Sequence, residues 1–159
     1  MDCLEPYGVE VGKGNYHEEI IYRLVILSNR ILDEISDYLG QFKLTPAKMN
    51  VLMIVKHQGG EKGISQVDLS QRLMVSTSNL TRVLAKLQRD KLVARGSIAN
   101  DRRFKTIHVT AKGSKLLDAV WPGYTKKLVG LTAGMDEEKK RLLSELLSQW
   151  MALVIKEQK

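Results

Sequence analysis

The stretch SQVDLSQRLMVSTSNLTRVLAKL, from Ser65 to Leu87, contains two consecutive helical patterns. In the first pattern, Ser65 and Asp68 fit a capping box, in which the Ser65 hydroxyl accepts a backbone N–H bond and the Asp68 side chain reaches back toward the cap. A short helix that ends at Leu73 is therefore expected. Ser76 is the N-cap candidate of the second helix, after a connector of two residues. Two helices joined this closely are typical of a helix-turn-helix.

The second helix has an apolar face and a polar face. Leu80, Val83, Leu84 and Leu87 recur at i, i+3, i+4 and i+7, which predicts a buried stripe. The opposite face carries short polar side chains near its N-terminus and long cations toward its C-terminus. In a recognition helix, the first kind reaches base edges in the major groove and the second reaches phosphates. The predicted DNA contacts on this helix are Ser76, Thr77, Ser78, Asn79, Thr81, Arg82, Lys86 and Arg89. For Asn79, capping of the helix is the alternative role.

A basic hairpin is expected after this helix. Residues 92–98 and 105–110 are β-prone runs rich in branched side chains, and the polar segment between them supplies turn chemistry. Ile64 is a candidate for a third, very short strand that closes the sheet. The order of two capped helices and then a basic hairpin predicts a winged helix-turn-helix, which reads double-stranded DNA.

The hairpin residues resemble the MarR family of bacterial transcription regulators. The matching residues are Asp101-Arg102-Arg103, Ile107 and Val109-Thr110-Ala111-Lys112-Gly113, which fit the family's wing pattern of D-x-R, three residues, an aliphatic, x, an aliphatic and T-x-x-G. Leu87, Leu92, Val93 and Arg95 extend the resemblance into the preceding helix and strand. At Lys91 the chain departs from the family, which usually has glycine there, the residue that favours a left-handed helix C-cap.

The resemblance implies a role for each residue of the wing. Arg103 is the residue expected in the minor groove, where the negative potential attracts a guanidinium, and Asp101 would orient nearby arginines. Arg102 and Lys105 are expected to contact phosphates, and Arg95 is a further DNA-contact candidate. For an isolated Asp-Arg-Arg triplet, the alternative interpretation is simply a polar hairpin tip.

The distribution of charge agrees with a DNA-binding lobe. The 159 residues have a net charge of +7. Residues 59–115 contain 12 Lys or Arg against 4 Asp or Glu, a net charge of +8, whereas the rest of the chain contains 13 against 14. Confinement of the basic charge to one lobe is the electrostatic footprint that phosphates require; a solvated charged face is the alternative.

The composition also indicates where the protein is located and which bound groups to expect. No stretch approaches the about 20 apolar residues of a membrane span, and no signal peptide is visible, so the protein is expected to be cytoplasmic and without a membrane partner. Cys3 is the single cysteine, which excludes an intrachain disulfide. Some members of the family sense oxidants through an N-terminal cysteine, and the alternative for Cys3 is an inert thiol. The Cys and His spacing suggests no metal site, and no cofactor is expected.

The expected organisation has three parts. Residues 1–14 form a flexible N-terminal arm, residues 15–42 and 114–159 form dimerisation helices, and residues 43–113 form the winged helix-turn-helix lobe. The fold class is therefore mainly α with a small β wing. The terminal helices carry more apolar surface than one small lobe can hide, which predicts a homodimer that binds an inverted repeat.

An effector site is expected between the dimerisation helices and the lobe, as the resemblance implies. Candidates for an aromatic and Met-rich lining able to hold a small aromatic or anionic effector are Tyr22, Arg23, Tyr38, Met49, Met53, His57 and Trp121. Packing in the core is the alternative for each of them.

Three functions are compatible with these patterns. The favoured one is a ligand-responsive DNA-binding regulator, more specifically a repressor. The second is a constitutive DNA-binding or architectural protein without an effector. The third is a small enzyme, which the sequence does not support because it has no nucleophile elbow, phosphate loop or H-E-x-x-H motif.

Overall fold

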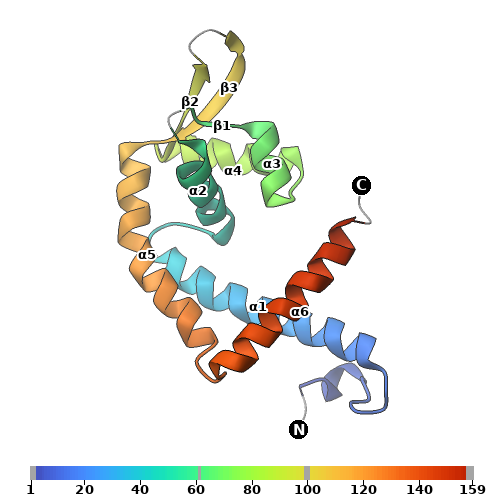
Figure 1. The fold of residues 1–159 in the computed structure, drawn as a ribbon. Coiled ribbons are helices and arrows are strands. Elements are labelled where there is room, and N and C mark those ends of the chain that lie inside the picture. The colour runs from blue at the N-terminus through green and yellow to red at the C-terminus, as the bar shows by residue number, and fades with distance from the viewer. Residues whose placement is uncertain (1–2, 61, 99–100, 157–159) are drawn as a thin grey trace. The chain divides into compact units, whose positions relative to one another are not determined.

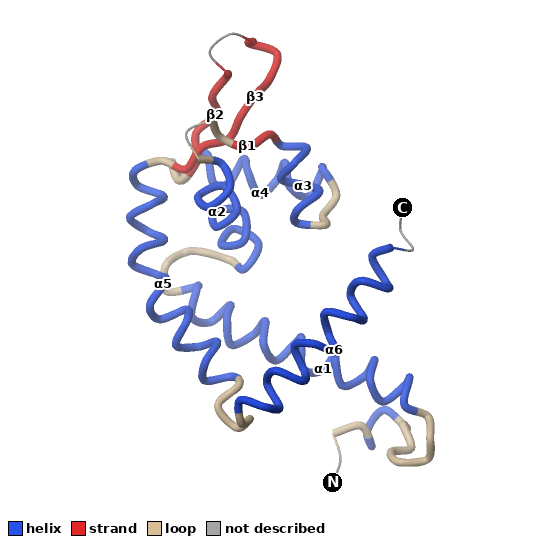
Figure 2. The backbone as a smooth tube through the Cα atoms, in the orientation of Figure 1, coloured by secondary structure: helices blue, strands red, loops and turns tan. Residues whose placement is uncertain are grey.

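The computed structural model describes residues 3–60, 62–98 and 101–156, and it describes only the backbone of residues 97, 98, 101–105 and 156. Helices form most of the chain and the strands are confined to one small sheet (Figure 2). The chain divides into two compact units, Met1–Tyr124 and Thr125–Lys159. The boundary lies inside a helix, so it differs from the boundaries expected from the sequence.

A 3-10 helix, Glu5–Tyr7, and five α-helices lie wholly or partly in the described residues of the first unit. The α-helices are α1 (Tyr16–Gly40), α2 (Pro46–Gly59), α3 (Gln66–Leu73), α4 (Thr77–Arg89) and α5 (Ala111–Leu131), the last of which continues into the second unit. The hydroxyls of Thr45, Ser65 and Ser76 each accept a bond from the backbone N–H three residues later. Both predicted caps of the helix-turn-helix are therefore confirmed.

Three antiparallel strands form the sheet, in the order β1-β3-β2. They are β1 (Ile64–Ser65), β2 (Val93–Ile98) and β3 (Asp101–Val109). Ile64 pairs with Ile107, so the predicted third strand is present. β3 begins at Asp101, earlier than the expected residue 105, because pairing of Ile98 with Asp101 overrides the low strand propensity of the polar segment. In Figure 1 the β2–β3 hairpin extends beyond α2, α3 and α4.

The core of the lobe is built around α2, which contacts α3, α4 and β3. Its Leu52 is fully buried, as are Leu69 of α3 and Leu87 of α4. Ile107 and Val93 add the inner face of the sheet to the same cluster. The side chains of α1 and α5 that join this cluster include Leu39, Leu117 and Val120. One continuous core thus fixes the helix-turn-helix against the hairpin.

The start of α5 explains why the T-x-x-G pattern ends in glycine. The Thr110 hydroxyl donates to the Lys91 carbonyl at 2.8 Å and accepts from the Gly113 backbone N–H at 3.0 Å, which caps the helix. A Cβ atom at Gly113 would lie 2.2 Å from the Leu92 carbonyl oxygen. Because that neighbour is backbone, the close approach of α5 to Leu92, the residue before β2, requires glycine at residue 113.

The segment expected to be a flexible arm packs against the start of α1 in this structure. Leu4 and Val9 are buried. The Gly12 backbone N–H donates to Glu19 at 2.8 Å, and Glu19 is itself only 9% exposed. The expectation of a flexible arm did not foresee this packing, because a segment with three glycines and one proline has no helical or strand period that would place its two apolar side chains.

The second unit contains the end of α5 and the helix α6 (Glu137–Lys156). Asp136 caps α6 by accepting from the Lys139 backbone N–H at 2.8 Å. Large apolar side chains on α6 remain exposed, among them Leu142, Leu146, Leu153 and Val154. Within the described ranges, the helices are all too short or too polar to cross a bilayer.

Lys91 holds the left-handed position at the C-terminus of α4. Its φ is +60°, and the bonds from Lys91 N to the Gln88 carbonyl and from Leu92 N to the Leu87 carbonyl, both 2.9 Å, form a Schellman motif. The helix therefore ends with the same left-handed C-cap that glycine favours, although a lysine occupies the position.

Replacing Lys91 with glycine is expected to stabilise the protein. Lys91→Gly should raise the free energy of unfolding by about 0.5–1 kcal/mol, because the relief of left-handed strain exceeds the extra entropy of glycine in the unfolded chain. Lys115→Gly is the matched control, since it removes the same charge from an exposed position inside α5 and should lower stability by about 1 kcal/mol. Denaturant unfolding measures both; equal losses would show that Lys91 is unstrained.

Candidate nucleic-acid interface

The recognition-helix candidate α4 presents one face to the core and the other to solvent. Leu80, Leu84 and Leu87 are each 1% exposed or less, and Val83 is half-buried, which confirms the predicted stripe. The opposite side chains are exposed and are those proposed for DNA contact, together with one alanine: Thr77, Ser78, Asn79, Thr81, Arg82, Ala85, Lys86 and Arg89.

Hydrogen bonds order the N-terminal half of this face. The hydroxyls of Ser76 and Ser78 lie 3.1 Å apart. Ser76 accepts the Asn79 backbone N–H, so Asn79 is a capped residue rather than the cap. The Asn79 side chain instead accepts a bond from Arg82 Nη2 at 3.5 Å. Thr81 donates to the Thr77 carbonyl at 2.8 Å and contacts Gln66 Nε2 of α3 at 2.7 Å.

The C-terminal end of α4 is tied to its surroundings by ionic contacts. Lys48 Nζ of α2 lies 2.7 Å from Asp90 Oδ2, and Lys112 Nζ donates to the Asp90 carbonyl at 2.8 Å. The hydrogen bond from Lys48 holds the pKa of Asp90 below its ordinary value, although partial burial opposes this effect. In the described part of the chain no ion pair includes Arg82 or Lys86. Those two cations are therefore available to an external anion.

The wing is fixed to α4 at its base. Arg95 Nε of β2 donates to Gln88 Oε1 of α4 at 3.1 Å. On β3, Thr106 is buried and its hydroxyl lies 2.9 Å from His108 Nε2. Asp101, Arg102, Arg103 and Lys105 lie on the backbone of β3, but their side chains are outside the described part of the structure. Their roles in the wing stay predictions.

Comparison with known proteins agrees with this arrangement. Residues 42–103 match the sequence model of the MarR family. The HTH-type transcriptional regulator MhqR of Bacillus subtilis is 23% identical over 135 residues, which cover 83% of this chain and 91% of MhqR. PecS, an HTH-type transcriptional regulator of Dickeya dadantii, is 27% identical over 127 residues, 80% of this chain and 75% of PecS. The segment from α2 to the start of the wing thus matches the MarR family, and these similarities support a MarR-type winged-helix regulator.

A solved structure of a MarR-family fold matches most of the chain. The MepR–DNA complex of S. aureus superposes with a TM-score of 0.75 at 25% identity and covers 82% of this chain and 95% of MepR. The mainly helical fold with a small wing is therefore the fold of known MarR-type structures.

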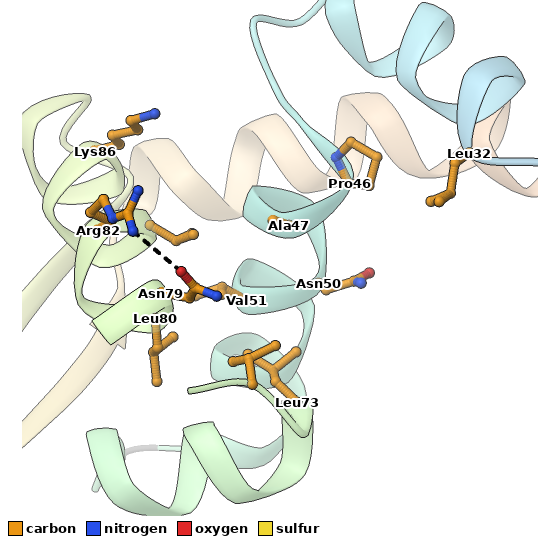
Figure 3. A pocket seen from close by; sticks show the side chains of 12 residues that line it. Leu32, Pro46, Ala47, Asn50, Val51, Leu73, Asn79, Leu80, Arg82 and Lys86 are labelled. Carbon is orange, nitrogen blue, oxygen red and sulfur yellow. Dashed lines mark hydrogen bonds between the residues drawn. The ribbon is translucent and has the colours of Figure 1, made fainter. Parts of the chain in front are cut away.

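A cavity of about 540 Å³ lies between α2 and α4 (Figure 3). Most of its wall is apolar, with Leu73, Leu80 and Val83 among the lining residues. Asn79, Arg82 and Lys86 also line it, so side chains proposed for DNA contact form part of its wall. The bond between Arg82 and Asn79 is the dashed line in Figure 3. The apolar wall suits the apolar part of a ligand, and Arg82 and Lys86 suit an anionic group.

The seven effector candidates from the sequence are distributed over separate places. Met53, His57 and Trp121 line a smaller pocket of about 270 Å³ that also includes the ion pair of Lys56 with Asp118. The other four candidates lie elsewhere: Tyr38 donates to the Val120 carbonyl, Met49 is buried in the core, Tyr22 packs on Tyr7 and Arg23 lies beside Glu19. They are scattered because α1 is long and its residues face different neighbours along its length. No group of three or more His, Cys, Asp or Glu side chains within the described residues could hold a metal ion.

Two kinds of residue at this interface are not predicted by any sequence pattern. The Gln66 side chain forms a hydrogen bond with Thr81, 15 residues later in the chain. The Gln88 side chain forms one with Arg95, 7 residues later. Lys48 anchors the end of α4 from 42 residues away. No local pattern signals such pairs; only the helix-turn-helix prediction itself, which places the start of α3 beside α4, could have pointed to Gln66.

Proposed function

We propose that this protein is a transcription regulator that binds double-stranded DNA in a sequence-specific manner. The observation that carries the proposal is the exposed face of α4, where small polar side chains precede cations and a leucine core fixes the rotation of the helix. The match of residues 42–103 to a family of transcription regulators supports it, as does the likeness to MepR bound to DNA. The same match argues against an enzyme.

Two arginines of α4 are expected to act differently on DNA. Arg82→Ala should relax the base preference at one position of each half-site and lose roughly 1–3 kcal/mol on the preferred sequence. Arg89→Ala should weaken binding to all DNA sequences about equally. Because one phosphate contact is lost, the slope of log affinity against log salt concentration should become shallower by roughly one unit.

Lys13→Ala, outside the basic lobe, is the control for loss of one charge. Sites are selected from random DNA, and affinities for selected and scrambled duplexes are then measured at several salt concentrations. Identical effects of Arg82→Ala and Arg89→Ala on both duplexes would contradict base reading by α4.

The protein is proposed to act as a homodimer on an inverted repeat with half-site centres about 10 base pairs apart. Exposed apolar side chains on each unit support this. On α1 they include Ile20, Ile21 and Val25, and on α6 they include Leu146 and Leu153. Exposed apolar area of this extent on two terminal helices is most simply covered by a second copy.

Charging the apolar face of α6 should separate the two copies. Leu146 is 54% exposed within one chain, so Leu146→Glu is expected to leave the fold intact and to convert a dimer into a monomer, as measured by sedimentation. Ala152→Glu adds the same charge at an exposed position elsewhere around the helix and should remain dimeric. A Leu146→Glu protein that still sediments as a dimer would remove α6 from the interface.

We further propose that DNA binding responds to a small aromatic anion held in the cavity between α2 and α4. Its apolar wall suits an aryl ring, and Arg82 and Lys86 suit a carboxylate. A ligand there would occupy the Arg82 side chain that base reading requires, so ligand and DNA compete. The regulator would then act as a ligand-released repressor within the proposed cytoplasmic setting.

Filling this cavity should remove the response without removing DNA binding. Ala47 is exposed at the rim on α2, so Ala47→Phe should abolish release of operator DNA by 4-hydroxycinnamate while free-protein DNA affinity stays within about twofold. Ala119→Phe, an exposed position on α5, is the matched control. Unaltered release from Ala47→Phe would place the effector elsewhere, including the smaller pocket at His57. No release from the wild type would favour the constitutive DNA-binding alternative.

A further inference from the structure

The Thr81 hydroxyl at the centre of the α4 polar face has two partners within the protein. Its Oγ1 lies 2.8 Å from the Thr77 carbonyl oxygen and 2.7 Å from Gln66 Nε2. A carbonyl oxygen can only accept, so the single hydroxyl proton is donated to Thr77. Gln66 must then donate through its amide nitrogen, because its amide oxygen would need the same proton. The hydroxyl is left with one lone pair and no proton for DNA.

We propose that Thr81 is a specificity-determining residue that accepts a hydrogen bond from the exocyclic amino group of a base, and that Gln66 is the positioning residue that holds the hydroxyl in this orientation. The proposal rests on the DNA-binding function proposed above. In the major groove, adenine and cytosine present amino donors, whereas guanine and thymine present carbonyl acceptors at the corresponding place. An acceptor-only hydroxyl binds the first pair of bases and repels the second.

The expected preference is therefore degenerate. Adenine N6 and cytosine N4 each offer a proton, so one lone pair cannot distinguish them. On one strand, at one position of each half-site, A or C should be preferred over G or T. This preference for a base with an amino group over a base with a carbonyl group selects two bases. A side chain that forms two hydrogen bonds to one base would select that base alone.

The surroundings of Thr81 favour direct contact with a base. Ser78 and Ala85, one turn before and one turn after, are exposed and small, so nothing bulky on the same strip of α4 holds the helix away from the groove. Gln66 is the first residue of α3, directly after the Ser65 cap, and is itself half-buried. Its amide is therefore held by an ordered helix start, which keeps the donor in place against Thr81.

The test compares the base preference of variants that keep side-chain shape. Sites are selected from random DNA with the wild type, and affinity is then measured for all four bases at each position. Thr81→Val identifies the position that this residue reads, where the wild type should bind A or C about 3- to 10-fold more tightly than G or T. Thr81→Val should reduce that ratio to less than twofold. Gln66→Met should lower it in the same direction, because without the Gln66 donor the hydroxyl is held only by its bond to the Thr77 carbonyl and can rotate to donate to a base carbonyl.

Gln71→Met, an exposed position near the end of α3, is the control and should keep the wild-type ratio. Thr81→Ser, which retains the hydroxyl, should keep the preference for A or C. A preference for G or T at the position sensitive to Thr81→Val, or an unchanged ratio in Gln66→Met, would overturn the proposal while leaving DNA binding intact. Failure of the wild type to select any sequence would instead overturn the proposed function, and this assignment with it.

Discussion

The rotation of α4 about its own axis is the constraint on which the interface depends. Leu80, Leu84 and Leu87 are buried together against α2 and α3, and burial of each stabilises the fold by roughly 1.5–3 kcal/mol. A single hydrogen bond contributes only about 0.5–1.5 kcal/mol net. Rotating the helix to bury another face would therefore lose more folding free energy than the polar contacts of α4 could restore. The outward face is polar because the inward face is fixed, and the DNA-contact candidates share that face for the same reason.

The polar tethers of α4 have a different role from the leucines. Lys48 with Asp90 and Arg95 with Gln88 are partly or largely exposed, and contacts of this kind contribute little to stability. They instead restrict direction: the first fixes the end of the helix relative to α2, and the second fixes the base of the wing relative to α4. The lowered pKa of Asp90 extends the pH range over which its carboxylate stays ionised toward more acidic values, so the tether to Lys48 is lost only well below neutral pH.

The features that the sequence predicted are those determined by neighbours in the chain. The Ser65 and Ser76 caps, the leucine stripe and the Ile64 strand each depend on residue type at short spacing, and the structure contains all of them. Contacts between distant residues could not be predicted. The buried arm beside Glu19, the early start of β3 and the scatter of the effector candidates result from tertiary packing, which no local period encodes. The residues of the candidate DNA face could therefore be predicted from the sequence, whereas the residues that position them could not.

Arg82 connects the two proposed activities because one guanidinium serves both. It belongs to the exposed DNA face and also lines the cavity between α2 and α4, where Asn79 is its partner in the free protein. A ligand carboxylate in the cavity would exchange the weak 3.5 Å contact with Asn79 for a charge-assisted bond. Bonds to charged groups contribute about 1.5–3 kcal/mol, which corresponds to a roughly 10- to 150-fold change in DNA affinity. Linkage makes the effect reciprocal, so operator DNA must weaken ligand binding by the same factor. One shared side chain is thus sufficient to couple the two sites, without movement of one unit of the chain against the other.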